Sequence, residues 1–176
     1  EISQDLELAG PDFMNMKLSK SALIKNITKM LENDKIYGFY KSDKKYNIEF
    51  VSANPTGPMH VGHCRGAIYG DVLANLLEFN GNKVTKEYYI NDYGNQIKNF
   101  VASVYYRIVE IKNKKKFPNK ENLYPGFYIK DIASKIISEN NDIVIDDIEK
   151  NFKFLKAESL KASMLWIERD LMQLGI

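Results

Sequence analysis

The chain has 176 residues, a net charge of +2, 44% hydrophobic residues and 27% charged residues. A chain of this length holds one domain, or one domain with part of another, and the composition is that of an ordinary soluble protein without a membrane-crossing apolar run. The charge is too small to indicate a nucleic-acid-binding surface by itself. The single cysteine, Cys64, excludes an internal disulfide and a zinc site of paired cysteines, and it favours the cytoplasm.

The N-terminal part of the chain is predicted to contain strand-like segments and one helix. A turn at Gly10-Pro11 precedes an alternating stretch at 13–18, which suits an edge strand of a sheet that is mostly missing. Apolar residues then recur at helical spacing as far as about residues 33–34. Either Ser19 or Ser21 is suited to cap this helix.

The middle of the chain alternates between strand and helix patterns. Residues 46–52 predict a strand, and a loop rich in glycine and proline follows. Helical spacing begins at Val61 and stops at Gly81, residues 84–90 predict a second strand, and a helix runs to about Lys112. The order strand, helix, strand, helix predicts an α/β fold with a Rossmann-like parallel sheet.

Helices are predicted to predominate beyond Lys112. The segments expected there are a basic run at 112–116, a turn at 124–128, helices at about 129–139 and 152–174, and an acidic segment at 140–149 between these helices. The basic run is interpreted either as a solvated loop or as a contact for nucleic-acid phosphates.

The loop between the first predicted strand and the next helix is predicted to bind a nucleotide. Ligands of open parallel sheets bind beyond the carboxyl ends of the strands, where a helix N-terminus favours phosphate. His60 and His63 fall on one face of the first helical turn, so both imidazoles are suited to donate to one phosphate. Histidine pairs also ligate metals, but no third ligand lies nearby in the sequence, so we predict no metal site. The predicted nucleotide-binding residues are Ala53, Asn54, Pro55, Thr56, Gly57, Pro58, Met59, His60, Val61, Gly62 and His63.

These residues carry a resemblance to a known family. His60-Val61-Gly62-His63 resembles the signature tetrapeptide of class I aminoacyl-tRNA synthetases, which related nucleotidylyltransferases share in a weaker form. Residues 9–18 are similar to the end of the N-terminal tRNA-binding domain of arginyl-tRNA synthetases, although a glycine is usual where Asp12 stands. Further stretches that closely resemble arginyl-tRNA synthetases are 49–58, 65–66, 70–71, 87–97, 124–128 and 170–176.

The resemblance, which spans nearly the whole chain, implies a fragment of a larger enzyme. The implied parts are the tail of an N-terminal tRNA-binding domain at 1–20, a linking helix and loop at 21–45, the first half of the Rossmann-like catalytic domain at 46–112, and part of a helical insertion at 113–176. The chain ends look cut. We expect the family's lysine-rich loop and anticodon-binding domain to lie beyond Ile176.

The resemblance also implies a reaction and its residues. L-arginine is activated by ATP with Mg²⁺ and is then transferred to tRNA(Arg), without a prosthetic group. His60 and His63 are the expected catalytic residues, as donors to the α-phosphate. The implied arginine-binding residues are Ser52, Asn54, Asn91, Asp92 and Gln96. Alternatively, Ser52 and Asn54 only shape the loop, and Asp92 caps the following helix.

The fragment is expected to be inactive alone and to dimerise or domain-swap through an exposed sheet edge, whereas the full-length protein is expected to be a monomer. Two other interpretations remain: another class I synthetase or a nucleotidylyltransferase, and a non-catalytic RNA-binding module derived from a synthetase. The stretch 91–96 argues against the first, and the intact histidine pair argues against the second.

Overall fold

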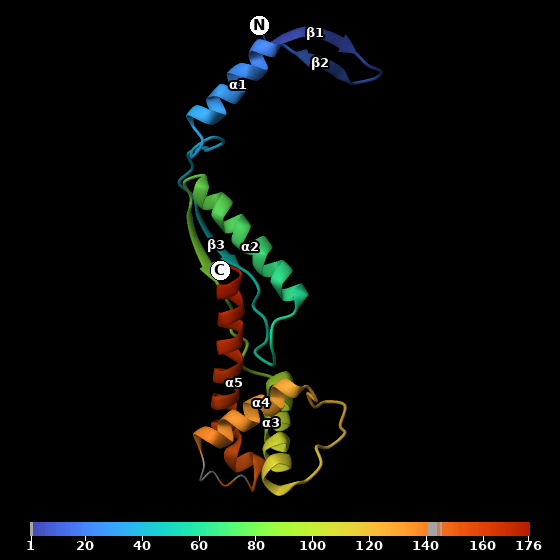
Figure 1. The fold of residues 1–176 in the computed structure, drawn as a ribbon, viewed down its shortest axis with the longest axis vertical. Coiled ribbons are helices and arrows are strands. Elements are labelled where there is room, and N and C mark those ends of the chain that lie inside the picture. The colour runs from blue at the N-terminus through green and yellow to red at the C-terminus, as the bar shows by residue number, and fades with distance from the viewer. Residues whose placement is uncertain (1, 141–143, 145) are drawn as a thin grey trace. The chain divides into compact units, whose positions relative to one another are not determined.

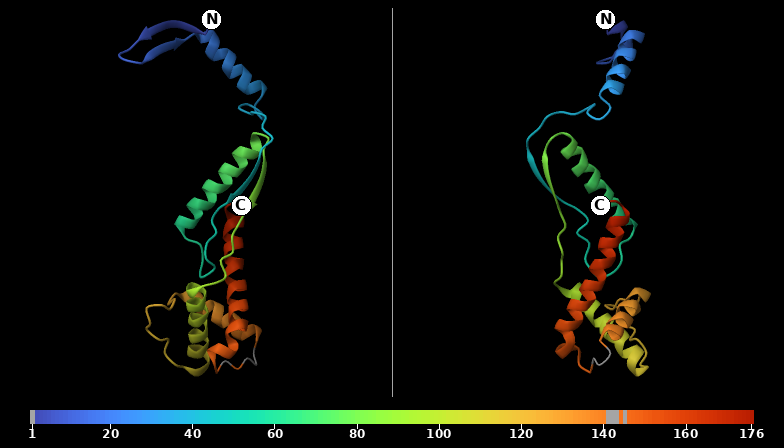
Figure 2. Two further views of the ribbon diagram at one scale, coloured as in Figure 1. Left: turned by 180° about the vertical axis from the view of Figure 1, so that it is seen from behind. Right: turned by 60° about the vertical axis from the view of Figure 1, so that its left-hand side comes forward.

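The computed structural model describes residues 2–140, 144 and 146–176, and the chain divides into two compact units (Figure 1 and Figure 2). The first unit comprises Glu1–Lys44 with Phe79–Asn82, and the second comprises Lys45–Glu78 with Lys83–Ile176. The four-part domain organisation expected from the sequence stays a prediction.

The first unit begins with two antiparallel strands, β1 (Ser3–Leu8) and β2 (Met14–Leu18). The stretch 13–18 therefore finds a partner strand within this chain. The turn between them is closed by a hydrogen bond from Ala9 N to Phe13 O of 3.0 Å, and Asp12 has a φ of 70°. This left-handed conformation costs a non-glycine residue free energy, which is the physical reason why a glycine suits the position.

Helix α1 (Lys20–Glu32) is capped by Ser19, not by Ser21. The buried Ser19 hydroxyl accepts a hydrogen bond from Ala22 N at 3.1 Å. This bond satisfies one of the amide groups that a helix start leaves without a partner. At the other end, the Asn33 side chain donates to the Lys29 carbonyl at 3.0 Å.

The second unit contains a parallel two-stranded sheet, β3 (Lys45–Glu49) and β4 (Lys83–Glu87). This confirms the predicted α/β fold with a parallel sheet, and α2 (Val61–Phe79) is the crossover helix beside the strands (Figure 1). Both strands end before the predicted residues 52 and 90. In β3 the reason is that Val51 and Ser52 have φ of 66° and 41°, outside the β region.

Two contacts hold α2 against the sheet. Gly70 faces Phe50, and a methyl group added there would lie 2.6 Å from Phe50 Cδ2. Lys86 of β4 donates to Asp71 Oδ1 at 2.5 Å and to Asn75 Oδ1 at 3.2 Å. The missing side chain at Gly70 allows α2 to lie close to Phe50, and the ion pair between Lys86 and Asp71 holds it there.

Three helices form the hydrophobic core of the second unit: α3 (Asn95–Asn113), α4 (Phe127–Glu139) and α5 (Ile148–Gln173). Helix α5 begins four residues before the predicted position because Asp147 caps it, accepting from Glu149 N at 2.8 Å. The core residues are Ile97, Phe100, Val101, Val104, Ile108, Ile129, Ile132, Ala133, Ile136, Leu155 and Ala162. Part of the predicted acidic segment, residues 141–143 and 145, lies outside the described residues.

The connection between α3 and α4 is tied to α3. Arg107 donates to the Pro125 carbonyl at 2.7 Å, and the buried Ser103 hydroxyl accepts from Tyr124 N at 2.9 Å. The basic run 112–116 is exposed, and its contact with nucleic acid stays a prediction. In the described part of the chain, no helix has the length and apolar character needed to span a membrane.

Candidate active site

The two histidines cap helix α2 together. His60 is the N-cap residue, since its carbonyl accepts from Cys64 N at 3.1 Å. Its Nδ1 accepts from Gly62 N at 3.2 Å, and His63 Nδ1 accepts from His60 N at 3.4 Å. This reciprocal arrangement resembles a capping box in which imidazoles replace the usual hydroxyl and carboxylate, except that His60 accepts from the second helical residue and not from the third. The rings stack with centroids 3.7 Å apart and planes 17° apart.

Capping also determines which ring nitrogens can donate. A neutral imidazole has one donor and one acceptor nitrogen, so accepting at Nδ1 assigns the proton to Nε2 in both rings. Partial burial lowers the pKa of His63, and the neighbouring His60 lowers it further. The neutral form of His63 is therefore favoured, and the pair offers two Nε2–H donors side by side.

Gly62 allows the two rings to approach the helix start. A methyl group at this position would lie 3.0 Å from His60 Cε1 and 3.1 Å from His60 Nδ1. A side chain at position 62 would therefore displace the His60 ring from the Gly62 amide that it caps. Glycine suits this position because it leaves room for the imidazole.

Amide side chains from the ends of both strands meet beside this loop. The carboxyl ends of β3 and β4 are adjacent, because Glu49 pairs with Glu87 in the parallel register. Asn54 Nδ2 donates to Gln96 Oε1 at 2.6 Å, and Asn91 Nδ2 donates to Asn54 Oδ1 at 3.1 Å. The structure thus brings together three of the predicted arginine-binding residues, although Asn54 lies about forty positions before Asn91 and Gln96 in the chain.

Ser52 joins the same edge of the sheet in a strained conformation. Its hydroxyl donates to Glu49 Oε1 at 2.7 Å and accepts from Tyr89 N at 3.1 Å. Both Ser52 and the β-branched Val51 have positive φ, which is costly for such residues and frequent where function requires a fixed geometry. The loop-shaping role of Ser52 therefore has direct geometric support.

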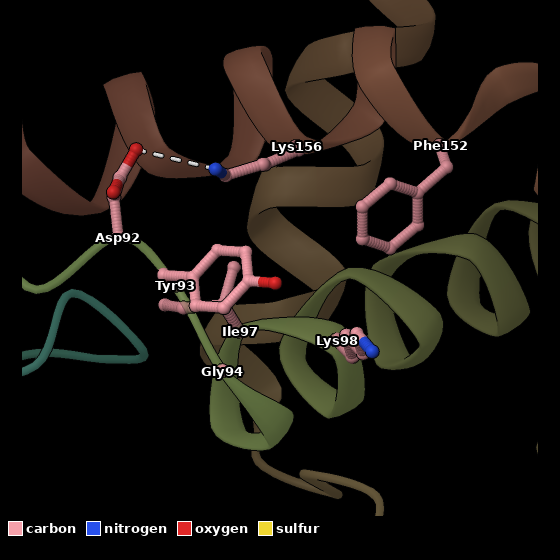
Figure 3. Close-up of a pocket in the computed structure, with 7 residues that line it drawn as sticks. All are labelled: Asp92, Tyr93, Gly94, Ile97, Lys98, Phe152 and Lys156. Atoms are coloured by element: carbon pink, nitrogen blue, oxygen red, sulfur yellow. Dashed lines mark hydrogen bonds and ion pairs between the residues drawn. The ribbon is translucent and has the colours of Figure 1, made fainter.

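Asp92 stands apart from the amide cluster. It forms an ion pair with Lys156 of α5 at 3.2 Å and lines a small hollow of about 70 Å³ with Tyr93, Ile97 and Phe152 (Figure 3). The alternative that Asp92 caps α3 is wrong, because the N-cap residue is Gly94 and no side chain caps that end. The structure does not bring Asp92 into hydrogen-bond contact with Asn54, Asn91 or Gln96 within the described residues.

A comparison with protein families identifies the domain that carries this geometry. The family model for the catalytic domain of class I tRNA synthetases of the R (arginine) type matches residues 26–162. The chain belongs to this family. It is 49% identical to an arginine–tRNA ligase of Pelagibacter ubique over 98% of this chain and 30% of that relative. It is 46% identical to one of Bartonella bacilliformis over 97% of this chain and 30% of that relative.

A solved structure agrees with this family. A Campylobacter jejuni chain assigned as an arginyl-tRNA synthetase is 33% identical, with a TM-score of 0.75 over 90% of this chain and 35% of that chain. This confirms the class I synthetase catalytic fold. The chain spans about 30% of the length of the curated relatives named above. The match to the arginine type argues against assignment to another synthetase or to a nucleotidylyltransferase.

Two tyrosines of this synthetase domain were missed as site residues by sequence reasoning. The Tyr88 hydroxyl donates to the Ala53 carbonyl at 2.8 Å, at the start of the loop 53–58, called here the nucleotide loop. Tyr128 of α4 packs against Gly57 in the same loop. Tyr88 lies within the predicted strand 84–90, which gives no indication of a site role, and Tyr128 lies in the family-like stretch 124–128 without any indication of its contact.

Proposed function

We propose that the full-length protein is an arginine–tRNA ligase that activates L-arginine with MgATP and transfers it to tRNA(Arg) in the cytoplasm. The observation that carries the proposal is the histidine pair, whose Nδ1 atoms cap α2 and whose Nε2–H groups are left to donate. Family membership and relatives at 41–49% identity support the arginine type. Because the chain spans only part of these relatives, we expect it to be inactive alone.

The proposed role of His60 and His63 is to donate hydrogen bonds to the α-phosphate as arginine attacks it. This displacement develops charge on the phosphate oxygens, and preorganised donors stabilise such charge without reorganising during the reaction. The imidazole cap supplies this preorganisation, because each ring is held to the helix backbone. Removing one donor of this type costs roughly 2.7–4 kcal/mol of transition-state stabilisation.

The proposed site for arginine is the edge of the sheet where the two strands end. Asn54, Asn91 and Gln96 offer amide N–H groups to a carboxylate and carbonyl oxygens to an ammonium group. The carboxylates of Glu49 and Glu87 lie on adjacent strand ends and favour a cationic substrate. We also propose as arginine-binding residues Ser52, whose hydroxyl donates to Glu49, and Asp92, which forms an ion pair with Lys156.

Mg²⁺ is proposed to enter as part of the MgATP substrate. No group of three or more His, Cys, Asp or Glu side chains suited to a metal ion occurs among the described residues. Mg²⁺ in nucleotide sites keeps several waters and binds substrate phosphates. The donor set of this part of the chain therefore fits a metal carried by ATP better than a resident ion.

The proposal is tested with the full-length protein by ATP–pyrophosphate exchange with each amino acid, with and without tRNA. Among the amino acids, only arginine should support exchange, and arginyl-tRNA should form. Exchange with a different amino acid, or tRNA binding without adenylate formation, would refute the proposal. Sedimentation of the same preparation tests the expected monomer.

The histidine role needs variants that separate catalysis from capping. His60→Asn keeps an N-cap acceptor and His63→Gln keeps the residue type that completes a capping box, but both remove the imidazole. Each should slow adenylate formation about 10²- to 10³-fold while hydrogen exchange of the first turn of α2 stays unchanged. Wild-type rates in both variants would mean that the pair serves only as a cap.

A further inference from the structure

Tyr128 packs against the nucleotide loop from a helix that is distant in sequence. A methyl group added at Gly57 would lie 3.1 Å from Tyr128 Cζ and 3.2 Å from its Oη. These distances are shorter than ordinary van der Waals separations, so the ring occupies the space that a side chain at position 57 would fill. The contact joins α4 directly to the loop that leads into His60.

The helices around Tyr128, and not the loop, fix the position of its ring. The ring packs edge-on against Trp166 of α5, with centroids 6.2 Å apart, and belongs to the side chains around the hydrophobic core. A methyl group at Gly126 would lie 2.7 Å from Tyr128 Cδ1, so the glycine lets the ring fold back over the start of α4. Burial raises the pKa of the Tyr128 phenol, and the hydroxyl therefore stays neutral.

We propose that Tyr128 is a positioning residue that holds the nucleotide loop so that His60 and His63 keep their places. The start of the loop is already held, because Tyr88 donates to the Ala53 carbonyl and Pro55 is fully buried. Gly57 lies three residues before His60, and its contact with Tyr128 constrains the other end. The helical part of the domain thereby sets the location of the two imidazole donors. The catalytic consequence rests on the proposed function, whereas the contact does not.

The kinetic test compares three variants of the full-length protein. Tyr128→Ala removes the ring, and Tyr128→Phe keeps it. As a control, Tyr105→Ala removes a half-buried tyrosine of α3 whose hydroxyl donates to the Asp146 carbonyl. At saturating arginine and ATP, with tRNA(Arg) present, Tyr128→Ala should lower the single-turnover rate constant of adenylate formation about 10- to 100-fold, since small misplacements have effects of this size. Tyr128→Phe and Tyr105→Ala should stay within about twofold of the wild type.

The rate constant and the reaction amplitude separate positioning from folding. A loss of folded protein lowers the amplitude, whereas misplaced donors lower the rate constant. The KM for ATP should change much less than the rate constant, because the lost interactions belong to the transition state. A rate constant for Tyr128→Ala equal to that of Tyr105→Ala would overturn the proposal.

Hydrogen exchange tests the contact without any activity. In the full-length protein, peptides covering residues 53–60 should exchange faster in Tyr128→Ala than in Tyr128→Phe or Tyr105→Ala. Equal exchange in all three would overturn the proposal. If exchange responds as expected but the wild type forms no arginyl-adenylate, the proposed function fails and the holding of the loop by Tyr128 stands.

A fourth variant covers the case in which Tyr128→Ala does not fold. The methyl group of Gly57→Ala would clash with the Tyr128 ring and displace the loop, so this variant should slow adenylate formation strongly when Tyr128 is present. In a Tyr128→Leu background, which lacks the ring, the same change should have a much smaller effect. Equal effects in the two backgrounds would show that the two positions are not coupled, against the proposal.

Discussion

Replacement of two glycines in α2 by alanine should affect stability differently. Gly66 and Gly70 lie one turn apart, and alanine is favoured over glycine in a helix by about 1 kcal/mol. Apart from the helix backbone and the two adjacent residues, no atom of the described residues lies within 4 Å of a methyl group at Gly66, whereas one at Gly70 would lie 2.5 Å from Phe50 Cβ. Overpacking of this kind costs about 1–3 kcal/mol. Gly66→Ala should therefore stabilise α2, and Gly70→Ala should leave it unchanged or less stable by up to about 2 kcal/mol.

Hydrogen exchange of α2 amides in the full-length protein measures both effects locally, and chemical denaturation measures them globally. The mechanism predicts that Phe50→Ala removes the difference, so that Gly70→Ala becomes stabilising in that background by about 1 kcal/mol. An equal gain from Gly66→Ala and Gly70→Ala in the wild-type background would refute the close contact between α2 and Phe50 as the determinant of helix position.

Other features of the structure lead to three further predictions. Ser19→Ala should destabilise α1 by about 0.5–2 kcal/mol in hydrogen exchange, and Ser21→Ala, which removes only the bond between the Ser21 and Ser19 hydroxyls, should have a smaller effect. Ile108→Ala should cost about 2–5 kcal/mol in chemical denaturation, because Ile108 is fully buried. Since the pKa of His63 is lowered by burial and by His60, its contribution to stability is present above its ordinary pKa of 6.5 and is lost as the pH falls through the lower folded value. A pH titration of stability should show this loss, and His63→Gln should reduce it.

Hydrophobic spacing was sufficient to predict the helices and the parallel sheet, but not the ends of the strands. The sequence 50–52 favours a strand by composition, because valine is a good strand former. In the structure Val51 and Ser52 turn into the left-handed region, and the bond from Ser52 to Glu49 stabilises the turn. The contacts of Ser52 at the site therefore outweigh the local strand propensity, and a periodic sequence pattern does not reveal such contacts.

The candidate site was predictable to the extent that its residues follow the ends of strands. Asn54 and Asn91 each follow a strand, and the parallel register brings them together as expected for such a sheet. Asp92 shows the limit of this reasoning, since its position suits a cap but its carboxylate is held by Lys156 of α5, more than sixty positions away in the chain. The contact of Tyr128 with Gly57 has the same character, because it depends on packing between distant segments.

The imidazole cap couples stability and chemistry in the same atoms. Glutamate at position 63 would complete a conventional capping box and would favour the helix N-terminus electrostatically. It would also place a negative charge where we propose that a phosphate binds, and it has no N–H to donate. Neutral histidine satisfies both requirements, because Nδ1 accepts from the backbone while Nε2 remains a donor. The pKa of His63 is lowered first by partial burial and then by the neighbouring His60, whose ring centroid lies 3.7 Å away, and both effects favour the neutral form that the two roles of His63 require.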